Sequence, residues 1–597
     1  MKIKFFLLLF VFSSVLFAEE LYNPFSFDAY LTSSFGENRG TRYHAGIDFS
    51  TEMEEGFAIF APENGIVKEI RVSPYFYGKV LYFLGESKRI WVFAHLSNFN
   101  KTLDSLVFIK QNQLQKNDVK IFPKMKMQKG DTLAFSGSTG IGNPHLHLEI
   151  RTEKNQVLSP CKNNVLCHDT LAPFLLAAAA FSDTLLKTTN EAALKEGCLE
   201  RPETPFHLAF KVVDYSRTPL ENPMSVYRVE LFSDSSKKTS VYKKIQDTLS
   251  YNNMIQIREE LLFAEEVDTA GDYHYIPEKI SEKTKRLWLE IEDFSSHVTS
   301  YSFTLEDSCK KNSDFKKQKY GDSLLFTFLS RPVISFKNCN KPFILKDKNG
   351  NVLHRNLCEL YNGKEIWLTT LSEHFKTAMF LETPQGTITF YPLEKKNFKI
   401  RRDGFSLEIK NIKSSGFKNT FAYRKVKTDS LEYLEMHPKG LHFSGNLTFC
   451  FETNTENPLY YLGETTRRWF YFSKQDSKKK KRCVSMNEIR DLAFILDTIP
   501  PKISEPYLAK AKIQGNEKEV YRIPVIETQS GIKNGNAFSA FINKKWTPIE
   551  YDSETKELIL EKRFLNKKDT LKICLEDEAG NSCCELLSDF LYLEQRF

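Results

Sequence analysis

The sequence predicts a mainly β protein built from several domains in tandem. At 597 residues the chain is too long for one hydrophobic core, and roughly three to five domains are expected. After the first third, short runs of alternating apolar and polar residues recur between turns rich in Asn, Asp, Gly and Lys. No helical pattern separates most of these runs, which is typical of β-sandwiches. The N-terminal part is also β-rich, with more glycine turns.

Changes in composition divide the chain into a short apolar leader and several β-rich segments. The extended, proline-containing stretch LDTIPPKISEPYL introduces the last of them. Asp-centred turns in FKVVDYSRT, LEIEDFSSH and LKICLEDEAGNSCCELL are weak signs of related Ig-like modules. The expected order is a leader at 1–18, a first domain at 19–170, a β-sandwich at 171–310, one or two β-rich domains at 311–495, and an Ig-like β-sandwich at 496–597.

Three segments carry local expectations of their own. The polar stretch 98–129 within the first domain is compatible with a helix. The stretch LLAAAAFSDTLL, which follows Pro173, is expected to be a connector with helical tendency. The basic run SKKKKR at 477–482 is expected to be a solvated loop, and contact with an anionic polymer or lipid is the alternative.

The N-terminal stretch MKIKFFLLLFVFSSVLFAEE is typical of a secretory signal peptide. Two lysines precede an apolar run, and cleavage is expected after Ala18. An uncleaved membrane anchor is the alternative, but the apolar run is short for a spanning helix. No later segment is long and apolar enough to span a membrane, so we expect an exported protein, periplasmic or extracellular, without stable membrane insertion after cleavage. The small net charge of +7 does not indicate a nucleic-acid partner.

The 11 cysteines fit an oxidising compartment. The sequence contains no CxxC pair, so neither a thiolate zinc site nor a thioredoxin-like redox site is favoured. The odd count leaves at least one thiol free or paired outside the chain. Cysteines that lie close in sequence are expected to form disulfides: Cys161 with Cys167, Cys339 with Cys358, Cys450 with Cys483, and Cys574 with Cys583 or Cys584.

The stretch PHLHLEI places two histidines, His145 and His147, two residues apart. On a β-strand both would face the same way together with Glu149, while Leu146 and Leu148 would face a core. Two imidazoles on one face can share a metal ion. A half-exposed polar face without a function is the alternative, and this stretch alone does not decide between them.

Two further motifs supply candidate metal ligands. RYHAGIDF contains His44 and Asp48, in what is expected to be a loop entering a strand, and VFAHLSNF contains His95. A catalytic zinc needs three protein ligands and an open position for water. Two histidines and one aspartate would leave the metal a net positive charge, which acidifies a bound water to a pKa of roughly 7. Further histidines can carry a proton and hold an oxyanion, although each histidine taken singly can also be a buried, hydrogen-bonded residue.

The motifs SSFGENRGTRYHAGID, APENGIVKEI, YGKVLYF, FAHLSNF, KGDTLAFSGSTG and PHLHLEIR, in this order, resemble the lysostaphin/LytM-type zinc endopeptidases, peptidase family M twenty-three. The resemblance implies a β-rich fold of the duplicated-hybrid-motif type, with the active site in a groove across a sheet. It implies that His44, Asp48 and His147 hold one Zn²⁺ per chain. It also implies that His95 and His145 are the catalytic pair, and which of them is the general base stays open.

The resemblance covers most of residues 33–151 and none of the later domains. The glycine turn STGIGNPH is shorter than the commonest form, Leu148 stands where Phe is common, and Phe93 stands where Tyr is common. None of these departures touches an expected ligand. The stretch 98–129 is longer than usual and can reshape one wall of the groove, which puts substrate specificity in doubt.

The resemblance implies a secreted peptidoglycan endopeptidase that cuts cross-links or stem peptides with zinc-activated water. A non-catalytic cell-wall binding protein or amidase activator on the same domain is one alternative, but such proteins lose ligands and here all five positions are filled. A secreted protease acting on proteins is another. Only a short segment precedes the first domain, so any gating is expected from the 98–129 stretch or from the later domains.

Overall fold

The structure is a computed structural model that describes residues 21–587 with gaps. The predicted leader at 1–18 and Cys339 lie outside the described residues. Strands dominate, so the predicted mainly β fold is confirmed, and no helix in the described ranges is long and apolar enough to cross a membrane. The gaps are 38–42, 182–185, 218–221, 234–238, 246–247, 250–271, 311–334, 337–343, 356–357, 362–364, 369–377, 384–385, 392–397, 403–404, 411–420, 429–430, 438–441, 454, 464–467, 473–474, 479–480 and 567.

The N-terminal domain, residues 21–165, is built on an antiparallel sheet of order β1-β2-β11-β6-β5-β4-β8, with a smaller sheet of order β3-β10-β7. One hydrophobic core contains side chains from both sheets. Its elements are β1 Leu31–Ser33, β2 Ile47–Ser50, β3 Ala58–Phe60, β4 Gly65–Val72, β5 Lys79–Gly85, β6 Ile90–Leu96, β7 Asn98–Phe99, α1 Lys101–Leu114, β8 Val119–Ile121, β9 Met125–Met127, β10 Thr132–Phe135, β11 His145–Arg151 and β12 Val157–Leu158.

The helix expected within 98–129 is present as α1. The side chain of Asn100 accepts a hydrogen bond from the Leu103 backbone N–H and thereby caps the helix N-terminus. Leu103 and Val107 are buried in the N-terminal domain. On another side of the helix, Phe108 stacks on Phe564 near the C-terminus, with ring centroids 5.7 Å apart. The helix therefore packs both on the N-terminal domain and on a residue near the C-terminus.

The second region, residues 174–306, has two sheets of order β14-β13-β16-β20 and β15-β22-β21-β17-β18 that share one core. The helical tendency expected for LLAAAAFSDTLL is wrong, because residues Phe174–Phe181 form the strand β13 between β14 and β16. Tertiary pairing overrides the helix propensity of alanine here. The elements are β13 Phe174–Phe181, β14 Leu186–Asn190, α2 Glu191–Lys195, β15 Cys198–Glu200, β16 Phe206–Val213, β17 Arg228–Phe232, β18 Ser240–Ile245, β19 Thr248–Leu249, β20 Asp272–Ile280, β21 Arg286–Glu292 and β22 Val298–Glu306.

The third region, residues 335–494, holds three sheets, of which the longest has the order β25-β24-β28-β29-β32-β33-β39-β35-β36. The basic run at 477–482 is not a plain loop as expected, because its ends pair as the strands β37 and β38. The elements are β23 Ser335–Phe336, β24 Ile344–Asp347, β25 Val352–Arg355, β26 Cys358–Tyr361, β27 Glu365–Leu368, β28 Ala378–Thr383, β29 Gly386–Tyr391, β30 Phe398–Arg402, β31 Phe405–Lys410, β32 Phe421–Lys427, β33 Glu432–His437, β34 His442–Glu452, β35 Leu459–Leu462, β36 Trp469–Tyr471, β37 Gln475–Lys478, β38 Lys481–Glu488 and β39 Leu492–Phe494.

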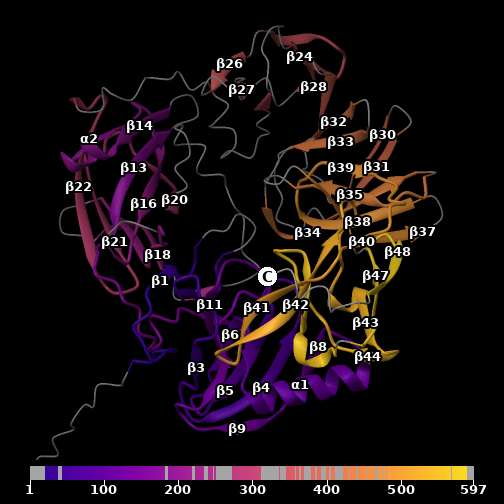
Figure 1. Ribbon diagram of the computed structural model, residues 1–597. Helices are drawn as coiled ribbons and strands as arrows, with labels where there is room; N and C mark the ends of the chain where they lie inside the picture. Colours follow the sequence, from indigo (N-terminus) through magenta and orange to yellow (C-terminus); the bar gives the residue numbers. More distant parts are fainter. Residues whose placement is uncertain are drawn as a thin grey trace, which may run out of the picture.

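The C-terminal region, residues 502–587, again has two main sheets around one core. It returns to the start of the chain, so that β41 and β42 lie beside β8 and α1 (Figure 1). Asn117 donates to the backbone oxygens of Gly535 and Phe538, at 2.7 and 2.9 Å, and accepts from the Ile549 N–H at 2.9 Å. The elements are β40 Lys502–Ile503, β41 Tyr507–Ile513, β42 Asn516–Ile526, β43 Phe538–Ile542, β44 Lys545–Thr547, β45 Glu550–Asp552, β46 Glu557–Glu561, β47 Leu571–Glu576 and β48 Ser582–Leu587.

The disulfides follow sequence proximity in most cases. Three of the expected pairs are confirmed, and the choice at residue 574 falls on Cys584, which leaves Cys583 as a free thiol. A fourth disulfide, Cys198–Cys309, was not foreseen because its partners are 111 residues apart in sequence. The confirmed pairs are Cys161–Cys167, Cys450–Cys483 and Cys574–Cys584.

Two of the Asp-centred turns are alike in their hydrogen bonds. The Asp293 N–H donates to the His297 carbonyl at 3.1 Å, and the Asp293 carboxylate accepts from the His297 N–H at 2.9 Å. The same two bonds join Asp577 and Asn581, at 3.0 and 2.8 Å. Asp214, in contrast, lies in an isolated β-bridge. The second and C-terminal regions therefore share one local turn.

Candidate active site

Strand β11 brings the sequence motifs together. His147 lies opposite Asp48 on β2 and opposite Ala94 on β6, so that His95 is the next residue on the neighbouring strand. The leucines at 146 and 148 are fully buried, as the alternation predicted. His95 has a φ of +58°, a left-handed conformation that is uncommon outside glycine and costs on the order of 1 kcal/mol. Such backbone strain is frequent at functional sites.

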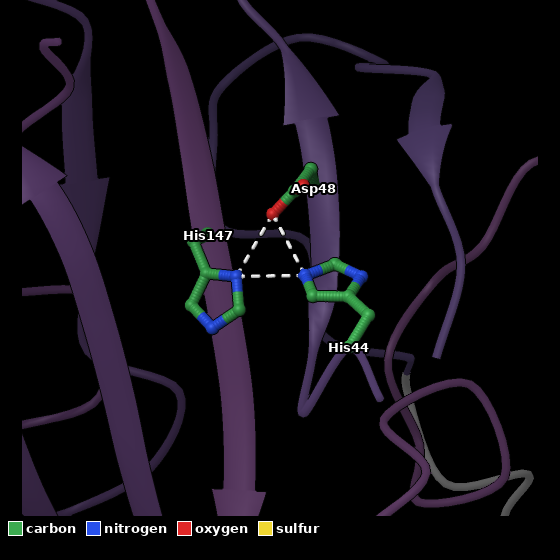
Figure 2. A group of neighbouring side chains, drawn as sticks. All are labelled: His44, Asp48 and His147. Atoms are coloured by element: carbon green, nitrogen blue, oxygen red, sulfur yellow. Dashed lines mark hydrogen bonds and ion pairs between the residues drawn. The ribbon is translucent and has the colours of Figure 1, made fainter. Parts of the chain in front are cut away.

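Three donor atoms form a small triangle (Figure 2). Asp48 Oδ1 lies 3.2 Å from His44 Nε2 and 2.8 Å from His147 Nδ1, and the two nitrogens are 2.9 Å apart. Ligand atoms around a tetrahedral zinc are about 3.3 Å apart, given bond lengths near 2.0–2.1 Å. A nitrogen–nitrogen–oxygen set of this size, 3–5% exposed, fits a small divalent metal ion after a slight opening.

His44 is held by the residues that precede it. It lies in the loop before β2, as expected, and its Nδ1 is 2.8 Å from the carbonyl oxygen of Ser34 and 3.0 Å from Ser33 Oγ. Donation from Nδ1–H to the Ser34 carbonyl leaves the lone pair on Nε2, which faces Asp48. The Ser34 hydroxyl in turn accepts a 2.8 Å hydrogen bond from the Ser225 N–H of the second region. The support of this candidate ligand thus extends beyond the N-terminal domain.

His147 is oriented by a buried carboxylate that the sequence analysis did not assign to the site. Its Nε2 is 2.9 Å from Oε1 of Glu149, which is fully buried. The Tyr77 hydroxyl also donates to Oε1, and Arg151 lies 2.5 Å from Oε2. A proton on Nε2 leaves the lone pair on Nδ1, toward Asp48, which is how outer partners fix a metal-binding imidazole. The alternation His-x-His-x-Glu-x-Arg along one strand is the sequence signal from which the role of Glu149 could have been predicted.

The remaining two histidines lie beside the triangle. The rings of His95 and His145 are 4.5 Å apart, and His145 Nε2 is 3.7 Å from Asp48 Oδ1. The Nδ1 of His95 is bonded to the Thr139 carbonyl at 2.9 Å, and that of His145 to the Asn143 carbonyl at 2.6 Å. Both bonds place the proton on Nδ1, so the neutral rings present Nε2 as an acceptor.

In the metal-free protein, the histidines of the site differ in the direction in which their pKa values shift. Burial, together with the neighbouring imidazoles, lowers the pKa of His95 to about 3. Burial would also lower the pKa of His147, but hydrogen bonds to Asp48 and Glu149 outweigh it and raise this pKa to about 9. Burial opposes ionisation of Asp48, yet the adjacent His44 and His147 hold the pKa of its carboxyl well below the usual range. The anionic aspartate is therefore ready to bind a cation.

The glycine turn before β11 is shaped in part by the C-terminal region. Gly140 and Gly142 both have a φ of +95°, and a Cβ on Gly140 would lie 2.3 Å from the Phe76 carbonyl. The Ser553 hydroxyl donates to the Gly140 carbonyl at 3.0 Å, and Glu554 accepts from the Gly142 N–H at 3.4 Å. The turn that leads into His145 is therefore contacted from residues more than four hundred positions away.

The long stretch 98–129 contributes to a different cavity. A space of about 530 Å³ lies between α1 and the C-terminal region, and its lining includes Lys79, Asp104 and Glu550. Lys79 Nζ is 2.7 Å from Glu550 Oε2, an ion pair that joins the two parts. None of the five predicted site residues lines this cavity.

The β-rich fold and the His–Asp–His donor set are features of a metallopeptidase domain. The sequence profile of Peptidase family M23 matches residues 42–160, and the chain therefore carries a LytM-type domain of this family near its N-terminus. The match spans all five predicted site residues and leaves the later regions unassigned. No curated protein matches the sequence.

Solved structures are also similar to part of the chain. The catalytic domain of a variant of the prophage-encoded M23 protein EnpA from Enterococcus faecalis is 20% identical, covering 22% of this chain and 88% of that one, with a TM-score of 0.18. A zinc containing peptidase from Vibrio cholerae is 22% identical over 25% of this chain and 41% of that one, also at 0.18. A chain of the SpoIIIAH–SpoIIQ complex is 17% identical, covering 24% and 99%, at 0.19.

Proposed function

We propose that this protein is an exported zinc metalloendopeptidase that hydrolyses peptide bonds of peptidoglycan. The observation that carries the proposal is the buried triangle of His44 Nε2, Asp48 Oδ1 and His147 Nδ1 with two further imidazoles beside it. These three residues would hold one Zn²⁺ per chain. When bound, zinc supplies Lewis-acid chemistry, because it lowers the pKa of a water molecule and polarises a scissile carbonyl.

In this proposal the two remaining histidines have different roles, one in proton transfer and one in orienting the water. The exposed fraction of the His145 side chain is 17%, whereas burial makes the charged form of His95 costly. We therefore assign proton uptake from the attacking water, and its delivery to the leaving amine, to Nε2 of His145. His95 stays neutral, with Nε2 as a hydrogen-bond acceptor that orients the water. The Thr139 and Asn143 carbonyls keep both rings in the required tautomer.

The proposals of export and of the substrate class are supported by the disulfides and by the M23 domain. Four disulfides among the described residues are typical of a protein that folds outside the cytoplasm. The M23 domain supports a peptidase of the cell envelope, and we infer peptidoglycan as its substrate. The filled set of five site residues favours an enzyme over a non-catalytic binding protein.

The test compares two neighbouring histidines on the same strand. His145→Ala should retain zinc and lose turnover by roughly 10²–10⁴-fold, because it removes a proton carrier. His147→Ala should lose zinc and activity together, because it removes a ligand. Zinc content and the muropeptides released from purified sacculi would be measured by mass spectrometry on the same protein batches, with and without a chelator.

A parallel assay with casein separates the substrate classes. Cleavage of sacculi but not of casein supports the peptidoglycan proposal, and the reverse result would replace it with a general protease. Full activity in both variants would refute an enzyme that uses this site. Loss of zinc in His145→Ala but not in His147→Ala would reverse the two roles.

A further inference from the structure

A short segment of the C-terminal region lies against the loops around the proposed catalytic pair. It consists of residues 550–554, which are strand β45 and the two residues after it, and we call it the contact segment. At its start, Glu550 forms the ion pair with Lys79, whose side chain is only 13% exposed. At its end, Ser553 and Glu554 contact the glycine turn before β11. The contact segment therefore packs on the N-terminal domain through both a shielded ion pair and the glycine turn.

The hydroxyl of Ser553 lies between two loops of the N-terminal domain. Its oxygen is 2.6 Å from the carbonyl oxygen of Pro74, in the loop between β4 and β5, and 3.0 Å from that of Gly140, in the glycine turn. A hydroxyl has one hydrogen to donate, and here two acceptors share it. Both acceptors are backbone atoms, so the contact fixes the path of the chain in the two loops at a common point.

Each of these loops carries a backbone carbonyl that holds His95. The Tyr77 carbonyl accepts a hydrogen bond from the His95 N–H, and the Thr139 carbonyl accepts one from His95 Nδ1, both at 2.9 Å. Tyr77 follows Pro74 by three residues, and Thr139 directly precedes Gly140. The positive φ of His95 persists only if its surroundings impose it. The placement of His95 therefore depends on both of the loops that the Ser553 hydroxyl joins.

The glycine turn also carries the hydrogen-bond partner of His145. The Asn143 carbonyl accepts from His145 Nδ1 at 2.6 Å. The contact segment reaches the turn just before this carbonyl, at the Gly140 carbonyl and, through a longer contact of 3.4 Å, at the Gly142 N–H. Glycine has the least restricted backbone of all residues, so contacts from outside contribute much to fixing such a turn. Both imidazoles of the pair thus depend on a turn that the contact segment holds.

We propose that the C-terminal region completes the active site, with Ser553 as a residue that positions His95 and His145. This inference rests on the proposed function, in which the two imidazoles act on the attacking water. Ser553 acts through backbone carbonyls and is not itself a catalytic residue. The three proposed zinc ligands are positioned by β2, by the loop before it and by β11, so loss of the Ser553 hydroxyl should impair turnover and leave metal binding intact.

The test replaces Ser553 in the full chain and measures digestion of dye-labelled sacculi by the zinc-loaded enzyme. Ser553→Ala should lower the maximal rate by roughly five- to a hundredfold, because a small misplacement of catalytic groups is costly. Zinc content and the sacculus concentration at half-maximal rate should stay as in the native enzyme. Ser553→Thr keeps the hydroxyl and should recover most of the rate. Ser582→Ala, at an exposed position of the same region, is the matched control and should behave like the native enzyme.

Hydrogen exchange measured by mass spectrometry tests the geometry without using catalysis. In zinc-loaded Ser553→Ala, peptides covering 73–78 and 137–145 should exchange at least about threefold faster than in the native chain, and peptides covering β2 should not change. If the native chain does not digest sacculi, the proposed function fails, and the exchange rates still decide whether Ser553 holds the two loops. Unchanged exchange in these peptides would overturn the inference, as would a native maximal rate in Ser553→Ala or equally low rates in both variants. Loss of zinc in proportion to the loss of rate would also overturn it, in favour of a general role in stability.

Discussion

Replacing Glu149 by glutamine should weaken the proposed metal site without removing any of its three proposed ligands. One carboxylate oxygen accepts from His147 Nε2 and Tyr77, and the other from Arg151. A glutamine has one oxygen and one NH₂ group, so in either orientation a donor meets another donor. If the NH₂ group faces His147, the ring is pushed toward the wrong tautomer, with a proton on the atom that faces Asp48.

The size of the effect follows from these contacts. Loss of an outer partner of a metal-binding histidine typically lowers metal affinity about 10–100-fold, which corresponds to about 1.4–2.7 kcal/mol. If the NH₂ group instead faces Arg151, one charge-assisted hydrogen bond is lost, and folding stability falls by about 1.5–3 kcal/mol. Glu149→Gln should therefore reduce zinc affinity, stability or both, while all three ligands remain.

The assay is competition for zinc against a chelator of known affinity, together with thermal unfolding of the metal-free protein. Activity should fall at limiting zinc and recover at saturating zinc, unlike that of a variant lacking a ligand. Glu153→Gln, an exposed position just after β11, is the matched control and should behave like the native protein. Zinc affinity within twofold of native and an unchanged Tm in Glu149→Gln would refute the role given to this carboxylate.

Three further outcomes are expected. The metal-free protein should lose stability as pH rises from about 6.5 to 9, by at most roughly 3 kcal/mol. The reason is that folding raises the pKa of His147 from 6.5 to about 9, so the proton that stabilises the fold is released over this range. Urea unfolding in the presence of a chelator at several pH values tests the sign of this change. Asn117→Ala should cost about 1–3 kcal/mol and open the contact with the C-terminal region, seen as faster limited proteolysis, whereas unchanged proteolysis would show that this contact is not needed. Denatured, unreduced protein should show one reactive thiol per chain, Cys583, if Cys339 pairs with Cys358, and several reactive thiols would contradict export into an oxidising compartment.

The sequence by itself determined the β character of the chain and the identity of the candidate site. Alternation along PHLHLEI predicts which side chains of β11 enter the core, because a strand turns every second residue to the same face. Local chemistry also decided most disulfides, since cysteines a few positions apart meet within one loop, as at Cys161–Cys167, or within one hairpin, as at Cys574–Cys584. The motif order near the N-terminus led to the M23 domain, and the family match agrees.

Tertiary structure decided whatever depends on partners distant in sequence. The alanine-rich stretch at Phe174–Phe181 favours a helix locally, but pairing with strands on both sides makes it β13. The Cys198–Cys309 disulfide joins segments whose proximity no spacing predicts. The contact of Ser553 with the turn at Gly140 has the same origin. Periodicity reports the face on which a side chain lies, and only the folded chain determines what that face meets.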